Sequence, residues 1–123
     1  MAAARYDLEI EQGATFHFSL TLKNDQNAVM DLTNYAGRGQ IRKYVSSDAP
    51  LVCFTVAFSS PPTDGVVNIS LTANQTSSLP VAQTMDNTRP KSSYPYDIEL
   101  TKPDGTVLRI MEGLAKVSPQ VTR

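Results

Sequence analysis

The stretch from Thr15 to Leu22, Thr-Phe-His-Phe-Ser-Leu-Thr-Leu, decides the fold class of this chain. Polar and apolar residues alternate without interruption, which is typical of a β-strand with one buried and one solvated face. We expect its phenylalanines and leucines to face a core, and His17 to point outward with the hydroxyl residues. This stretch therefore predicts a half-buried strand near the start of the domain.

A second alternating run, residues 6–11, comes just before this strand. Its apolar members, Tyr6, Leu8 and Ile10, are expected to face the same core. Gly13 lies between the two runs, and glycine adopts a positive φ at little steric cost. The segment 12–14 is therefore predicted to be a tight connection or a bulge.

The same two-residue period recurs along the rest of the chain. It predicts further strands over residues 36–44, 51–58, 66–71, 94–101, 106–112 and 114–118. Thr72 and Leu79 bound the one helical turn that the pattern allows, the first as its cap and the second against the core. Because no long helix is available to carry parallel crossovers, we expect an all-β fold, an antiparallel immunoglobulin-like sandwich or a small barrel of seven to eight strands.

Two connections have strong turn chemistry. In the segment 29–35, Asp31 and Thr33 offer short acceptors for nearby backbone amides, so we expect a corner that inserts Leu32 into the core. The sequence Lys-Pro-Asp-Gly at 102–105 has a composition that β-turns prefer. It predicts a hairpin between the last two long strands.

Length and composition limit the organisation and the partners. The 123 residues fit a single domain over 1–123, with a flexible arm at 1–5, an exposed loop at 81–93 and a polar tail at 119–123. Eleven lysines and arginines face twelve acidic residues, so the basic footprint of a nucleic-acid-binding protein is missing. With no apolar run long enough for a bilayer and no signal-peptide pattern, we expect neither a nucleic acid nor a membrane as partner.

Side chains that could carry catalysis are few. His17 is the single histidine, and Cys53, the single cysteine, lies in an apolar run and fits folding in a reducing cytoplasm. A catalytic triad or a zinc site needs more of these groups close together. A glycosidase pair of carboxylates would depend on the fold, but a domain of this size leaves little room for a substrate cleft. We therefore expect no enzyme, no metal and no cofactor.

Arg42 and Asp97 are charges next to predicted core residues in two of the predicted strands. Either each lies on a solvated face, or the two form a cross-strand ion pair that fixes the strand register. The distance between guanidinium and carboxylate decides between these interpretations.

Several short motifs follow one another along the chain. They are Ile-Glu-Gln-Gly-Ala-Thr-Phe at 10–16, Asp-Leu-Thr-Asn-Tyr at 31–35, Gln-Ile-Arg at 40–42, Tyr-Asp-Ile-Glu-Leu at 96–100, the Asp104–Gly105 turn, Arg109, Gly113, Val-Ser at 117–118 and Val-Thr-Arg at 121–123. This ordered set resembles small β-sandwich virion proteins of tailed bacteriophages. The resemblance covers nearly the whole chain apart from the segment 81–93, which looks like an enlargement. It marks a set of positions as a structural motif: Gly13, Asp31, Leu32, Thr33, Arg42, Asp97, Gly105 and Gly113.

The resemblance implies a non-enzymatic structural component of a phage virion, present in several symmetric copies. It would be a tail or baseplate adaptor that docks fibres or neighbouring tail proteins through exposed sheet edges and mobile segments. Such relatives often continue into a shaft, whereas this sequence stops at residue 123, which favours a stand-alone adaptor. The candidate interface residues are Arg5, Arg89, Lys91, Tyr94 and Arg123.

Two other functions stay open at the level of the sequence. A capsid decoration protein would clamp adjacent shell subunits with the same kind of surface. A carbohydrate-binding module for host recognition would need a platform of exposed aromatic rings, for which Tyr44 and Tyr94 are the few candidates and tryptophan is absent.

Overall fold

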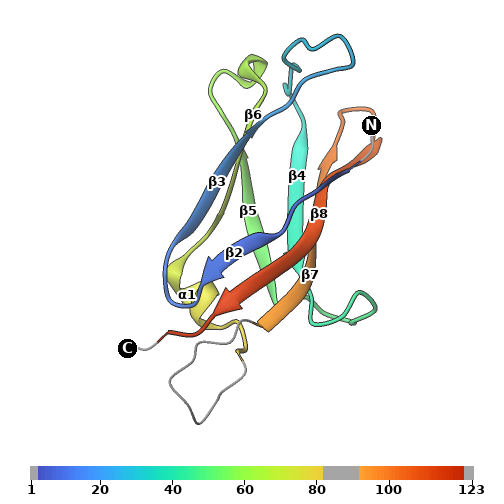
Figure 1. The fold of residues 1–123 in the computed structure, drawn as a ribbon. Helices are drawn as coiled ribbons and strands as arrows, with labels where there is room; N and C mark the ends of the chain where they lie inside the picture. Colours follow the sequence, from blue (N-terminus) through green and yellow to red (C-terminus); the bar gives the residue numbers. More distant parts are fainter. Residues whose placement is uncertain (1–2, 82–91, 121–123) are drawn as a thin grey trace.

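The computed structural model describes residues 3–81 and 92–120, which form mostly β-strands (Figure 1). The strands are β1 (Ala4–Arg5), β2 (Leu8–Glu11), β3 (Phe16–Thr21), β4 (Ala36–Ile41), β5 (Val52–Phe58), β6 (Val66–Leu71), β7 (Ser92–Thr101) and β8 (Val107–Ser118). A 3-10 helix, η1 (Pro62–Asp64), and one α-helix, α1 (Ala73–Ser77), connect some of them. The predicted all-β class with one short helical turn is confirmed.

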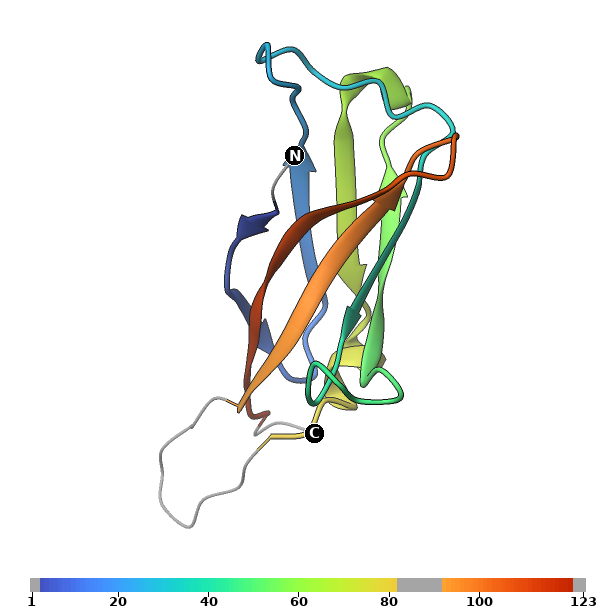
Figure 2. The same ribbon diagram turned by 90° about the vertical axis from the view of Figure 1, so that its right-hand side faces the viewer.

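The strands form one sheet that curls into a half-barrel. Their order is β1-β8-β7-β4-β5-β6-β3, and β2 also pairs with β8. β5 makes the corner, because its first residues (52–54) pair with β4 and its last residues (55–58) pair with β6. Figure 2 shows how the strands around β8 and those around β6 come to lie on two sides of one interior. The architecture agrees with the predicted sandwich or small barrel.

The expectation of a purely antiparallel sheet is wrong at the first two strands. β1 and β2 both run parallel to β8, with Ala4 opposite Met111 and Leu8 opposite Ala115. The alternation of apolar residues says which face of a strand is buried, but it is the same for either strand direction. The sequence pattern therefore had no means of predicting this parallel pairing.

The core fills the interior of the curled sheet with side chains from both of its sides. The predicted inward residues of β2, β6 and β7 are all buried there: Leu8, Ile10, Val67, Ile69, Leu71, Tyr96, Ile98 and Leu100. Leu32 from the corner and Leu79 after α1 are buried as well, as their positions in the sequence predicted. Thr72 caps α1 and forms a capping box with Gln75.

Tyr6 is an exception, because its side chain is 61% exposed although the alternation placed it inward. It precedes β2 in the short link from β1, and its backbone N–H donates to the Glu112 carbonyl, at 2.9 Å. The link follows the edge of β8 and not the core. The alternation of inward and outward side chains along β2 therefore does not extend back to residue 6.

The last strand differs from its prediction at two points. β8 runs unbroken through Gly113, where two strands were expected. A β-bulge interrupts its pairing with β7, since Met111 faces Ile98 whereas Arg109 faces Glu99, which leaves Ile110 as the extra residue. Both Ile110 and Met111 are buried as a result.

The predicted arm and loop overlap with strands where the structure describes them, and the tail contacts the rest of the fold. Ala4 and Arg5 form β1, so they are not a free arm, and Ser92 and Ser93 belong to β7 and not to the loop. Gln120 in the tail donates its backbone N–H to Gln12 Oε1, at 3.0 Å. Residues 1–2, 82–91 and 121–123 lie outside the described part of the chain. None of the described helices is long and apolar enough to cross a membrane.

Candidate functional site

A shallow hollow of about 340 Å³ lies on the outer face of β4, β7 and β8 and is lined by charged groups. Its charged members are Arg5, Arg42, Asp97, Arg109 and Glu112. Four of these five, all but Glu112, were named in the sequence analysis, although they come from distant parts of the chain. We refer to this surface as the charged hollow. It combines cations and carboxylates, so it is suited to polar contacts with another protein surface.

Of the two interpretations left open for Arg42 and Asp97, the ion pair is not found among the ion pairs of the described residues. Arg42 instead donates from Nη1 to the Ser47 carbonyl at 2.7 Å and from Nη2 to Gln40 Oε1 at 2.8 Å. The register explains this, because Asp97 lies opposite Gln40, while the Arg42 backbone N–H bonds to the Pro95 carbonyl. Arg42 therefore holds the loop after β4 in place.

Asp97 pairs with a different arginine, Arg109 of β8, whose Nε lies 3.4 Å from Oδ2. Partial burial raises the pKa of the Asp97 carboxyl, and the nearby negative charges of Glu99 and Glu112 raise this pKa further. Arg109 and Arg38 act in the opposite direction. Asp97 is thus a partly desolvated carboxylate at the centre of the charged hollow.

The closest ion pair between β4 and β7 joins Arg38 Nε and Glu99 Oε1, at 2.9 Å. These residues lie directly opposite each other in the register, and they form the kind of cross-strand ion pair that was considered as an alternative for Arg42 and Asp97. The sequence held one signal for this pair, since Arg38 is flanked by two glycines and so stands out from its strand. Arg38 is largely exposed, so the pair contributes little to stability.

Gly113 lies where the segment before β2 crosses β8. A side chain at this position would collide with the Tyr6 carbonyl oxygen. The same oxygen accepts a hydrogen bond from the Tyr96 hydroxyl. Asp7 accepts from the Leu114 backbone N–H at 3.1 Å and lies 3.6 Å from the Lys116 ammonium. These contacts attach the first strands to the last strand, so Gly113 has a structural role.

The other motif residues build turns, as the sequence predicted. Gly13 and Gly105 have φ of +86° and +93°. Asp31 Oδ1 accepts from the Thr33 backbone N–H at 3.0 Å and from its hydroxyl at 2.5 Å. The bonds from Thr33 lower the pKa of the Asp31 carboxyl. Leu32 of the same corner is buried.

Thr76 of α1 is a residue that the sequence interpretation missed. It is fully buried, and its hydroxyl accepts from the Gly13 backbone N–H at 3.0 Å and donates to the Ala14 carbonyl at 2.9 Å. It thereby connects the helix to the turn between β2 and β3. A threonine in a short helix carries no sequence signal of such a long-range contact.

The candidate interface residues have different positions. Arg5 is exposed on β1 at the charged hollow. Tyr94 is only partly exposed, packs against the core and donates its hydroxyl to the Pro80 carbonyl at 2.6 Å, so it serves the fold. Arg89, Lys91 and Arg123 lie outside the described residues.

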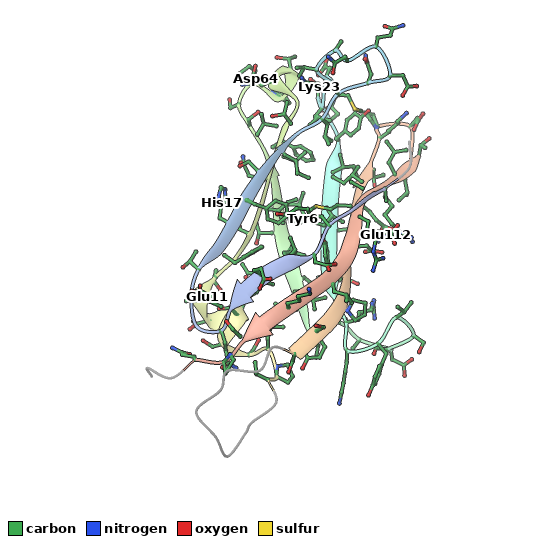
Figure 3. All side chains as sticks on the ribbon, in the orientation of Figure 1. Tyr6, Glu11, His17, Lys23, Asp64 and Glu112 are labelled. Atoms are coloured by element: carbon green, nitrogen blue, oxygen red, sulfur yellow. The ribbon has the colours of Figure 1, made fainter. Side chains whose placement is uncertain are left out.

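A second surface, here called the apolar groove, runs between β2 and β3 and has a volume of about 390 Å³. Phe16, Phe18 and Leu20 of β3 form one wall, and residues 6–9 form the other. Figure 3 shows Tyr6 in the region between β3 and β8, whereas His17 points outward from β3. The groove was not predicted, because it depends on two strands that are not hydrogen-bonded to each other.

The residues with catalytic chemistry are dispersed. His17 and Cys53 are both exposed, on β3 and β5 respectively. Over residues 3–81 and 92–120, no three histidine, cysteine or acidic side chains gather closely enough to hold a metal ion. A scan of protein-family models and a search of curated proteins both found no match to this chain.

Proposed function

We propose that this chain is a non-enzymatic structural protein of a tailed-phage virion, a tail or baseplate adaptor that docks fibres or neighbouring tail proteins. The assignment to a virion rests on the resemblance of the ordered sequence motifs. The observation that carries a docking role is the presence of two unlike surfaces on one small framework, the charged hollow and the apolar groove.

The two surfaces lie on different parts of the half-barrel. The charged hollow covers the outer face of β4, β7 and β8, whereas the apolar groove opens between β2 and β3. An adaptor must contact two neighbours at once, and chemically different surfaces let each neighbour be recognised separately. Gly113 supports this arrangement, because its lack of a side chain lets the segment before β2 lie against β8.

A carbohydrate-binding function finds less support in the positions of the aromatic residues. Tyr44 is 63% exposed in the loop after β4, with the Lys43 ammonium 5.8 Å from its ring centroid, and Tyr6 lies at the apolar groove. Tyr94 uses its hydroxyl within the fold. These rings belong to separate elements and do not form a common platform among the described residues.

Localisation in the virion tests the proposal. We would add an epitope tag after Arg123 in the phage genome that carries this sequence, purify particles and label them with gold-conjugated antibody for electron microscopy. Label at the tail tip or baseplate is expected, and deletion of the gene should yield particles that lack fibres or the baseplate. Untagged particles serve as the control.

The same experiment separates the alternatives. Label distributed over the capsid, together with fragile heads in the deletion mutant, would contradict the adaptor role and favour a capsid decoration protein. Particles without any label, from a lysate in which the tagged protein is present, would contradict every virion role.

A further inference from the structure

We propose that the apolar groove binds an extended segment of a partner protein, which adds as a β-strand along the open edge of β3. The segment has aliphatic residues at alternate positions and neutral polar residues between them. This inference deepens the proposed docking function and rests on it, because it names the kind of partner that the adaptor receives.

The hydrogen-bond direction along β3 leaves one edge available. The Leu22 backbone N–H donates to the Gly65 carbonyl at 2.8 Å, and the register continues through Leu20 opposite Val67 and Phe18 opposite Ile69. In an antiparallel ladder, alternate residues bond to the neighbouring strand. The backbone groups of His17, Ser19 and Thr21 therefore point away from β6.

No described strand occupies that edge. Within residues 3–81 and 92–120, β3 pairs with β6 alone and β2 pairs with β8 alone. β2 and β3 are consecutive in the chain but are not hydrogen-bonded to each other, so the half-barrel stays open between them. A strand placed there would continue the sheet from β3 toward β2.

The burial of the side chains shows that the inner face of β3 is only partly covered. Val67, Ile69 and Leu71 of β6 are fully buried, whereas their partners Leu20, Phe18 and Phe16 on β3 are only partly buried. Phe16 and Phe18 meet edge to face, 5.6 Å between ring centroids, so they offer a firm apolar surface. Apolar side chains of an added strand would extend the core over this surface.

The lining of the groove gives the polarity of the partner segment. Its apolar members are Leu8, Phe16, Phe18, Leu20 and Met111, and its ionisable side chains are Asp7 and Glu9 beside Tyr6. No lysine or arginine is among the lining residues. The Asp7 carboxylate already lies 3.6 Å from the Lys116 ammonium, so the added strand needs no basic residue, and neutral polar residues would fit beside Ser19.

An extended peptide satisfies these features better than a compact ligand. The open edge presents backbone donors and acceptors at every second residue along β3, and only another extended backbone matches that spacing.

Peptide selection on the isolated protein tests the inference. We would screen a display library of random peptides of about nine residues, the length of one strand with its flanks, against the purified chain. The enriched sequences are expected to carry aliphatic residues at alternate positions, neutral polar residues between them and no proline. Failure to enrich such sequences would overturn the inference, even if gold labelling had placed the protein in the virion.

The variant His17→Pro then tests the hydrogen bonds along the edge, with the best enriched peptide as probe. Proline removes the outward backbone N–H of residue 17, and it leaves the bonds of β3 to β6 unchanged. We expect binding about five- to tenfold weaker by fluorescence anisotropy, the effect of one lost hydrogen bond. His17→Ala is the matched control, since it removes the same side chain but keeps the N–H, and it should bind as the wild type does.

Amide hydrogen exchange gives a second measurement that does not depend on the folding of the proline variant. The amides of His17, Ser19 and Thr21 in the wild type should exchange more slowly once the peptide is bound. Unchanged exchange at these three amides, or equal binding by the proline and alanine variants, would show that the peptide does not add to β3.

Discussion

At Gly113 the backbone of β8 passes so close to Tyr6 that a methyl group would collide with the Tyr6 carbonyl oxygen. The φ of +155° is also unfavourable for a residue with a side chain. We expect Gly113→Ala to lower the free energy of unfolding by about 3 kcal/mol, through backbone strain and displacement of the first strands. Urea denaturation measures this loss.

Gly105→Ala is the matched control for this substitution. Its φ of +93° is also positive, but nothing lies within 4 Å of the position where the methyl group would be. Only the strain of the turn should appear, about 1 kcal/mol. Equal losses for the two variants would mean that the contact with Tyr6 has no energetic role.

Asp97 should make the stability of the protein depend on pH in an unusual direction. Its pKa is raised above the ordinary value of 3.8 by burial and by Glu99, so the native state binds a proton more readily than the unfolded chain. The wild type therefore loses stability from this group as the pH rises through the raised pKa. We expect the free energy of unfolding of Asp97→Asn, relative to that of the wild type, to increase as the pH rises through the raised pKa. Urea titrations at several pH values measure this difference.

Asp104→Asn should show the opposite dependence of stability on pH. The hydrogen bond from the Thr106 backbone N–H, at 2.9 Å, lowers the pKa of Asp104. The wild type therefore loses stability from this group as the pH falls through the lowered pKa, and the variant does not. If the stability of the two variants relative to the wild type changed with pH in the same direction, the burial of Asp97 would not explain the pH dependence.

The helix α1 is held to the rest of the fold by the Thr76 hydroxyl, which bonds to the turn between β2 and β3. Thr76→Val keeps the shape of the side chain but leaves the Gly13 N–H without its acceptor. We expect a loss of about 2 kcal/mol in the free energy of unfolding, with faster hydrogen exchange at Gly13.

The neighbouring Ser77 offers a comparison within the same element. Its hydroxyl donates to the Ala73 carbonyl at 2.8 Å, but at an exposed position. Ser77→Ala should therefore change the stability by no more than about 0.5 kcal/mol. A comparable loss in the free energy of unfolding for both variants would show that the burial of Thr76 does not determine the effect.

Single elements were predictable from the sequence where one local rule governs them. The period of two placed β3 and β6, and the capping residue Thr72 placed the start of α1. The bulge at Ile110 was not predictable, because it is a mismatch between two strands and not a property of either. For the same reason the sequence left the partner of Asp97 open, since register selects Arg109 over Arg42.

At the scale of the whole molecule, the surfaces proposed for docking arise from strand arrangement. The apolar groove exists because β2 joins β8 and leaves β3, its neighbour in the sequence, with an open edge. The charged hollow gathers Arg5, Arg42 and Arg109 from three distant segments. Neither surface has a signal in any one stretch of the chain.

The sequence by itself determined the all-β class, most of the residues that face the core, and the turns at Asp31 and Gly105. These depend on side-chain alternation and on backbone preferences, which are local properties of the chain. Only the tertiary structure decided the parallel pairing of the first strands with β8, the ion pairs and the two surfaces. Strand direction and register are set by the packing of the whole sheet, since the same alternation is compatible with several pairings.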